Sequence, residues 1–289
     1  MLDLLVGALV LSAIYALVGF AWVLLRRTNG ILNLATGAQL ALGAYIFNQY
    51  ATAWHLPWAV VVLGTFASLA GLGAVTHWVV FRKMSGQPEF ALVVATLGLA
   101  TALKGLLSLV WGTEPRVMRE PIASKVVTIA GDASTTVYGL GGLAAALLVF
   151  AAAYAFFRFS TTGIRMRAAA ENPVLSAQGG IAVDWVYVLG WAMALTVAAI
   201  AGIVYAYQTA LSFQGVDALG MRGLAPALVG GLTSILGVIP GALIVGCAET
   251  FGVKLFGGQV QDVAAWVVIL VVLLIRPEGL FGEKQVQRV

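Results

Sequence analysis

Two charged residues, Lys104 and Glu249, interrupt long apolar stretches of this chain of 289 residues. A charge inside a membrane is costly and usually belongs to a substrate or ion path, so both are candidate functional groups. Their positions also allow a simpler interpretation. Lys104 lies near enough to Trp111 for its amine to reach the outer surface, and Glu249 is spaced to pair with Lys254 about one turn further along a helix.

Polar side chains recur at spacings of four, three and three residues near the start of the second apolar stretch. They are Asn29, Asn33, Thr36 and Gln39. This spacing predicts that they share one face of a helix. Two interpretations stay open: the side chains hydrogen-bond to adjacent helices, as small polar residues do in membrane bundles, or they line a translocation path.

Motifs for enzymatic chemistry are absent from the sequence. It contains no H-E-x-x-H, G-x-S-x-G or G-x-x-x-x-G-K-[ST] pattern. Cys247 is the single cysteine, and neither His55 nor His77 has a second histidine or a carboxylate at ligand spacing, which argues against a metal site. We therefore predict no catalytic residue, no metal and no cofactor, and we expect any ATP hydrolysis to occur on separate subunits.

The composition indicates a membrane protein. Apolar residues make up 61% of the chain and charged residues only 10%, against roughly a quarter in soluble domains, and the mean hydropathy is +0.98. The net charge of +4 comes from scattered basic residues rather than one patch, which argues against a nucleic-acid partner. We predict an all-α polytopic integral membrane protein in the lipid bilayer, with one permease domain over residues 1–289.

About 20 apolar residues cross a bilayer as a helix, because lipid offers the backbone no hydrogen-bond partners. Six such stretches are predicted, at residues 4–25, 31–50, 57–81, 90–111, 136–157 and 185–208. Glycine and proline interrupt a seventh stretch at 223–252, and a shorter apolar run ends at Ile275. We therefore expect about eight membrane elements, of which the seventh is broken.

Basic residues mark the connections that stay in the cytoplasm. Three connections qualify, those with Arg26 and Arg27, with Arg82 and Lys83, and with Arg158, Arg165 and Arg167. The N-terminus and the loops at 112–135 and 212–220 are then outside. The C-terminal tail, with Arg276, Lys284 and Arg288, is predicted in the cytoplasm. An odd number of crossings must follow Gly220, so the stretch 223–252 is expected to enter and return.

The broken stretch also suggests a route through the protein, because irregular backbone at membrane depth is tolerated only where protein or a water-filled path surrounds it. Its candidate hinge consists of Gly237, Pro240 and Gly241. Gly237 and Gly241 form a small-xxx-small pair as well, whose usual meaning is tight helix packing.

The segment 158–184 is too polar to span a membrane. Asn172 is suited to cap a helix that begins at Pro173, which predicts two short helices on the membrane surface. One interpretation is an interfacial basic loop. The other is a docking element for a cytoplasmic partner, with candidate charged contacts at Arg165, Arg167 and Glu171.

This segment resembles a known family. The run Gly163-Ile-Arg-Met-Arg-Ala-Ala-Ala-Glu-Asn-Pro, followed by Gly180-Ile181, is similar to the cytoplasmic coupling loop of branched-chain amino acid ABC importer permeases, with the LivH-type subunit the most similar. The first two apolar stretches, the glycine-rich region at 225–249 and the terminal run Arg276-Pro-Glu-Gly-Leu-Phe-Gly282 agree with that family. The resemblance covers residues 7–282 in order.

The resemblance implies one half of the channel of an importer for branched-chain or similar small amino acids, in a bacterial inner membrane. The implied partners are a second homologous permease of the LivM type, two cytoplasmic ATP-binding subunits and an extracytoplasmic substrate-binding protein. The residues implied to couple to the ATP-binding subunits are Gly163, Arg165, Arg167, Glu171, Asn172 and Pro173.

The chain departs from that family in two places. Thr36 and Gln39 stand where members often carry His and Glu, and Arg222-Gly-Leu224 stands where they often carry Lys-Ala-Phe. Related permeases also carry amides, urea or other small polar solutes, so these are alternative substrates. An ion-coupled carrier acting alone is a further alternative, although such carriers usually place acidic residues at the membrane midplane.

Overall fold

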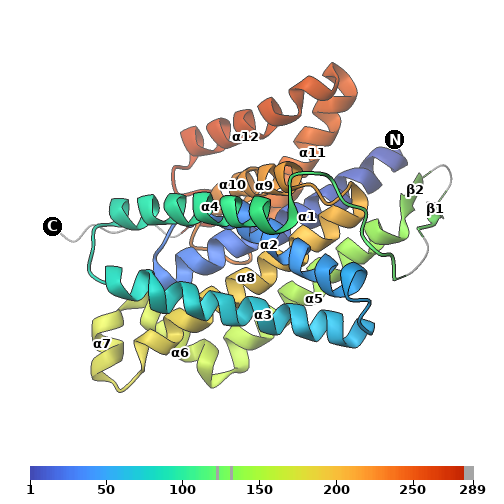
Figure 1. The fold of residues 1–289 in the computed structure, drawn as a ribbon. Coiled ribbons are helices and arrows are strands. Elements are labelled where there is room, and N and C mark those ends of the chain that lie inside the picture. Colours follow the sequence, from blue (N-terminus) through green and yellow to red (C-terminus); the bar gives the residue numbers. More distant parts are fainter. Residues whose placement is uncertain (122–123, 131–132, 283–289) are drawn as a thin grey trace.

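A computed structural model describes residues 1–121, 124–130 and 133–282 as a helical bundle (Figure 1). Its helices are α1 (Leu2–Asn29), α2 (Thr36–Asn48), α3 (Trp58–Val79), α4 (Glu89–Trp111), α5 (Val137–Phe159), α6 (Thr161–Glu171), α7 (Pro173–Gln178), α8 (Val183–Gln208), α9 (Phe213–Arg222), α10 (Leu224–Gly230), α11 (Val238–Phe256) and α12 (Gln261–Ile275). An antiparallel hairpin of β1 (Val126–Ala130) and β2 (Ala133–Thr136) lies between α4 and α5.

Within the described residues, seven helices are long and apolar enough to cross a membrane. They are α1, α3, α4, α5, α8, α11 and α12, where α3 and α12 include an adjoining 3₁₀ turn. The predicted all-α polytopic class is confirmed. The number of elements differs from the predicted eight because α2, α9 and α10 are too short to count as spans by themselves.

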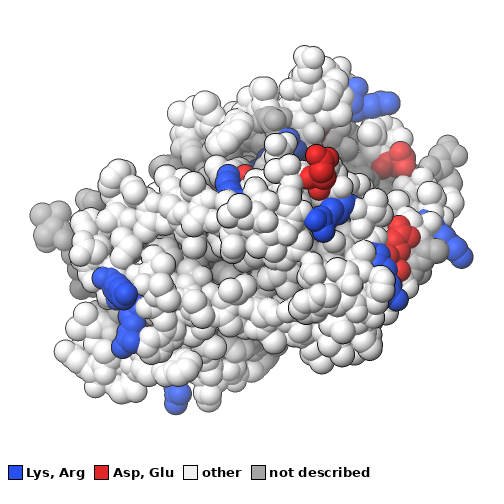
Figure 2. Space-filling model, in the orientation of Figure 1, with Lys and Arg blue, Asp and Glu red and all other residues white. Residues whose placement is uncertain are grey.

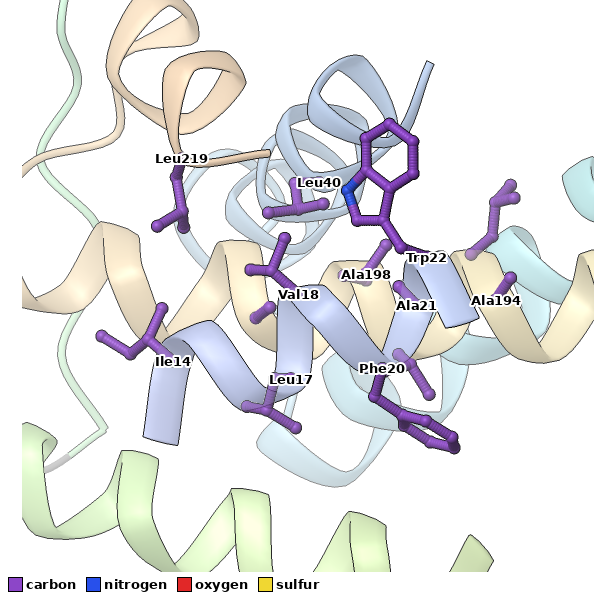
Figure 3. Close-up of a cluster of buried hydrophobic side chains, with 14 of the residues drawn as sticks. Ile14, Leu17, Val18, Phe20, Ala21, Trp22, Leu40, Ala194, Ala198 and Leu219 are labelled. Atoms are coloured by element: carbon purple, nitrogen blue, oxygen red, sulfur yellow. The ribbon is translucent and has the colours of Figure 1, made fainter. Parts of the chain in front are cut away.

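Helix α1 forms the centre of the bundle. All its residues from Ser12 to Leu25 are buried. This part of the helix is therefore surrounded by protein rather than lipid, as expected for a helix that is apolar on every side. Figure 3 shows Val18 of α1 pointing toward Leu40 of α2, in a core that also contains Ala198 of α8. Small side chains on α8 allow the helices to approach closely, which is how membrane helices gain packing contacts.

Helices α1, α3, α4, α5 and α8 confirm five of the predicted spans, with ends that differ by a few residues. Most apolar side chains of α3, α4 and α5 are at least partly exposed on the surface of the chain. These faces are left for lipid or for partner subunits. The space-filling view shows the resulting belt, which is almost uncharged over α3 and α4 (Figure 2).

The predicted second span, residues 31–50, is only partly correct. Gly30 adopts a left-handed φ of 71° and ends α1, residues 31–35 are not helical, and α2 begins at Thr36. All 13 residues of α2 are buried, and a π-helical turn at Gln49–Ala53 follows it. Protein surrounds α2, and this allows an irregular backbone to precede it at depth in the bundle.

The C-terminal part of the chain runs back and forth between the two ends of the bundle. Just before α9, Leu211 exchanges backbone hydrogen bonds of 2.9 and 3.1 Å with Arg116, near the hairpin. Just after α10, Gly231 lies against Gly282, which follows α12. The pair α9–α10 therefore crosses the bundle, α11 returns and α12 crosses again. The stretch 223–252 reverses direction at residues 231–237, in line with the predicted entry and return. Residues 212–220 do not form the predicted loop, because α9 occupies them.

The two ends of the bundle differ in charge. The hairpin end carries β1, β2 and the N-terminus, and the basic end carries α6 and α7 (Figure 1). All three connections predicted as cytoplasmic reach the basic end: Arg26, Arg27 and Arg167 line one cavity there, and Arg82 pairs with Asp184 of α8 at 3.3 Å. The three basic connections, which are separated along the sequence, therefore lie together at one end of the fold.

The residues after α12 donate hydrogen bonds to the last carbonyl groups of α10. The Leu280 N–H donates to Val229 O at 2.9 Å, and the Phe281 N–H donates to Gly230 O at 3.1 Å. The last carbonyls of a helix have no partner within the helix, so the chain after α12 satisfies them and holds α12 against α10. Lys284 and Arg288, predicted in the cytoplasmic tail, lie outside the described residues.

Candidate functional site

Three of the predicted polar residues meet at the irregular start of α2. Asn33 Nδ2 donates to Gln39 Oε1 at 2.8 Å, and Asn33 Oδ1 accepts from the Ala35 N–H at 3.1 Å. Thr36 Oγ1 donates to Asn33 O at 2.7 Å. Asn33, Thr36 and Gln39 are at most 2% exposed. Their hydrogen bonds fix the turn from which α2 starts, which supports the packing interpretation; lining of a path stays a prediction.

Asn29 does not share a helix face with these three residues, contrary to the prediction from spacing. It is the last residue of α1, and its Nδ2 donates to Tyr187 O on α8 at 3.1 Å. The spacing rule assumed one continuous helix from Asn29 to Gln39. Gly30 ends that helix, because glycine adopts a positive φ at no steric cost.

Helices α2 and α9 touch at two glycines. A Cβ on Gly220 would lie 2.1 Å from the Gly37 Cα, and a Cβ on Gly37 would lie 2.5 Å from Asp217 O. Trp22 Nε1 of α1 donates to Gly220 O at 3.0 Å. Only glycine permits backbones to approach this closely, so the contact fixes the position of Asp217 relative to α1 and α2.

Lys104 forms an ion pair with this part of α9. Its Nζ lies 2.8 Å from Asp217 Oδ2, and the two side chains are 43% and 21% exposed. Lys104 lies about two turns before the end of α4. Its amine contacts a specific carboxylate instead of extending toward the outer surface, as was predicted. Asp217 was not predicted as a candidate site residue because residues 212–220 were predicted to form a loop. The overlooked signal is Ser212, an N-cap residue whose Oγ accepts from the Gly215 N–H at 3.2 Å.

Glu249 is fully buried inside the bundle. The Tyr15 hydroxyl of α1 donates to Glu249 Oε2 at 2.6 Å, and Gln261 Nε2 of α12 donates to the same oxygen at 3.4 Å. The Arg222 side chain also interacts with Tyr15. Lys254, the partner suggested by spacing, is exposed. The carboxylate of α11 is therefore hydrogen-bonded to α1 and α12. Local spacing could not predict Tyr15 as its partner, because the two residues are far apart in the sequence.

The segment 158–184 folds into two short helices at the basic end, as predicted. Asn172 caps α7 by accepting from the Leu175 N–H at 2.9 Å, and Pro173 is the first residue of that helix. Ser160 caps α6 by accepting from the Thr162 N–H at 3.2 Å. These local caps explain why the sequence signal was sufficient here.

Helix α6 has an anchored face and an exposed face. Met166 and Ala169 are buried against α8. Gly163 lies so close to α5 that a Cβ would be 2.3 Å from Phe156 O. The exposed residues of this segment include Arg165, Arg167, Glu171, Asn172 and Pro173. A firmly anchored helix with exposed charges is suited to bind a partner and to transmit its movement.

A cavity of about 440 Å³ opens at the basic end beside α6. Its lining includes Arg167 and Glu171 of α6 together with Arg26 and Glu89, which form an ion pair between the end of α1 and the start of α4. The exposed charges of α6 are therefore continuous with a charged surface that reaches the membrane-spanning helices.

The candidate hinge residues Gly237, Pro240 and Gly241 lie at the start of α11. A Cβ on Gly241 would lie 2.4 Å from Pro226 O, and a Cβ on Gly237 would lie 2.4 Å from Gly230 O. The glycine pair therefore packs α11 against α10, in agreement with the usual meaning of the motif. A hinge role stays a prediction.

The candidate residues form two sets: a polar region between α2, α4 and α9, and a charged surface at the basic end. In the described part of the chain, no three His, Cys, Asp or Glu residues are grouped to hold a metal ion. In the first set only the Lys104–Asp217 pair is partly exposed, whereas Asn33, Thr36 and Gln39 are buried. The second set presents exposed charges that can contact another protein.

Comparison with known proteins gives a family over nearly the whole chain. The family described as "Branched-chain amino acid transport system / permease component" matches residues 4–276. The chain is 24% identical over 300 residues to the high-affinity branched-chain amino acid transport system permease protein BraD of Pseudomonas aeruginosa, covering 100% of this chain and 98% of the relative.

Two further relatives carry similar names. The chain is 25% identical over 295 residues to the corresponding permease protein LivH of Escherichia coli K12, covering 96% of this chain and 94% of the relative. It is 22% identical over 295 residues to a probable branched-chain amino acid transport permease protein LivH of Methanocaldococcus jannaschii, covering 96% and 91%. No solved structure matches the chain.

Proposed function

The chain belongs to the family of permease components of branched-chain amino acid transport systems, and on this premise we propose that it forms one half of the translocation path of an ABC importer for branched-chain or similar small amino acids. Its partners in this proposal are a second homologous permease of the LivM type, two cytoplasmic ATP-binding subunits and an extracytoplasmic substrate-binding protein. It lies in a bacterial inner membrane, with the N-terminus outside and the basic end and C-terminus in the cytoplasm.

The observation that carries the proposal is the exposed charged face of α6 at the basic end. Arg165, Arg167 and Glu171 contact an ATP-binding subunit in this proposal. The caps and close contacts at Gly163, Asn172 and Pro173 make the segment rigid, so movement of the ATP-binding subunit reaches α5 and α8 rather than being lost in a flexible loop.

The path itself lies along α2, α4 and α9 in this proposal. The turn made by Asn33, Thr36 and Gln39, together with Asn29 at the end of α1, holds the wall of the path in shape. The tight contact of α10 with Gly237 and Gly241, next to Pro240 at the start of α11, is the place where the two helices shift as the transporter alternates between its conformations.

Affinity purification of the tagged protein in mild detergent tests the assembly. Recovery of a second permease and two ATP-binding subunits with a phosphate-binding loop is the expected result. A homo-oligomer that takes up solute by itself would instead identify a self-sufficient carrier and remove the role given to α6 and α7.

Substitutions at the exposed face of α6 test the coupling. We expect Glu171→Ala and Arg167→Glu to leave the assembled complex intact but to abolish substrate-dependent ATP hydrolysis, because both side chains are exposed and their loss leaves the bundle packed as before. Lys254→Ala, an exposed charge on α11, is the matched control and should keep full activity. Normal coupling in both α6 variants would contradict the docking role.

A further inference from the structure

The ion pair of Lys104 and Asp217 has an unusual environment. Its 2.8 Å contact joins the middle of a strongly apolar helix, α4, to α9. Lys104 nevertheless keeps 43% of its side chain exposed at the surface of this chain. Charges at membrane depth are costly unless they face a partner, water or a solute. A pair that served packing alone would be expected to close against its own bundle.

The surface around the pair is open on both helices. Thr101 and Ser108 lie one turn before and after Lys104 on α4 and are exposed, as are Gln214 and Ala218 beside Asp217 on α9. The Phe213 ring lies 5.9 Å from the Lys104 amine. Two opposite charges are thus presented side by side among these uncharged neighbours.

The two charges are complementary to the ammonium and carboxylate groups that every α-amino acid carries. We propose that the Lys104–Asp217 pair recognises the zwitterionic head of the transported amino acid, with the Lys104 ammonium binding the α-carboxylate and the Asp217 carboxylate binding the α-ammonium. The inference rests on the proposed function, in which α4 and α9 face the path. Charge-assisted hydrogen bonds are the stronger class, and the four groups together stay neutral, so the site needs no additional counter-ion.

The fixed backbone position of Asp217 supports this role. Its backbone oxygen lies against Gly37 of α2, and Gly220 on the same helix contacts Gly37 as well. The carboxylate is therefore held in place before a substrate arrives, which lowers the entropic cost of binding. An amide or urea offers no carboxylate to Lys104, so the pair also predicts preference for amino acids over the neutral alternatives.

The test uses the complete importer with its own partners, reconstituted in proteoliposomes. We expect Lys104→Gln and Asp217→Asn each to lower the maximal rate of leucine uptake by about tenfold or more, the size of one lost charge-assisted hydrogen bond. Stimulation of ATP hydrolysis by the loaded binding protein should persist, so uptake per ATP falls. The matched control Lys254→Gln should transport normally.

A double substitution separates recognition from packing. Lys104→Met/Asp217→Leu replaces the pair by apolar side chains of similar size, an exchange that structural ion pairs usually tolerate. An assembled double variant without uptake supports recognition. Normal uptake by the double variant overturns it, and failure of both the single and the double variants to assemble overturns it in favour of a packing role.

Uptake by the unaltered importer distinguishes this inference from the proposed function. If the unaltered complex imports leucine and the variants match it, the zwitterion site alone is overturned. If the unaltered complex imports urea or an amide and no amino acid, the proposed substrate class fails together with this site.

Discussion

We expect Gly220→Ala to weaken the bundle strongly, although the change adds a single methyl group. The new Cβ would lie 2.1 Å from the Gly37 Cα, whereas carbon atoms pack at about 3.5 Å or more. The new methyl group would meet backbone atoms of Gly37. Neither residue has a side chain that can rotate away, so α9 must move by about 1 Å or more. Overpacking costs about 1–3 kcal/mol, and we expect the upper part of that range because the Trp22 hydrogen bond to Gly220 O is displaced too.

Gly105→Ala on α4 is the matched control for this prediction. Nothing lies within 4 Å of a Cβ at Gly105, and alanine is favoured over glycine in a helix by about 0.5–1 kcal/mol. Each variant is heated in mild detergent and the remaining monodisperse protein is measured by size-exclusion chromatography. The midpoint of Gly220→Ala should fall by several degrees and that of Gly105→Ala should not fall. Equal midpoints for the two variants would refute the close contact of α2 and α9.

Three further predictions follow from the site. In a Cys247→Ser background, Ser124→Cys should react with a membrane-impermeant reagent applied from outside and Gln178→Cys should react only after lysis; the reverse pattern would invert the proposed orientation. Tyr15→Phe removes a hydrogen bond to a buried carboxylate and should destabilise the protein by about 1.5–3 kcal/mol, and an unchanged thermal midpoint would show that the bond contributes little. Asn33→Leu should lower thermal stability because it breaks the turn before α2; a stable variant with altered substrate preference would instead place Asn33 on the path.

The long apolar helices with exposed faces could be predicted because an uninterrupted apolar run has one stable form in a membrane. Helices α3, α4 and α5 satisfy their own backbone hydrogen bonds and need no partner to form, so a local signal was sufficient. The same holds for α7, where Asn172 supplies the cap and Pro173 the first helical residue. In both cases the determinants lie within a few residues of the element that they specify.

Prediction from the sequence failed for α2 and α9, which are too short or too polar to be recognised as membrane helices without their neighbours. Helix α2 is short and starts irregularly because its neighbours shield its polar backbone. Helix α9 contains Asp217 and Arg222, so its hydropathy is that of a loop. The cost of a charge at depth depends on its partner, and the partner of Asp217 is Lys104, 113 residues earlier. Neither residue alone indicates a site: the lysine resembles a snorkelling side chain and the aspartate resembles a loop residue. Only their juxtaposition in the fold turns two costly charges into one neutral pair that is partly exposed at the surface of the chain.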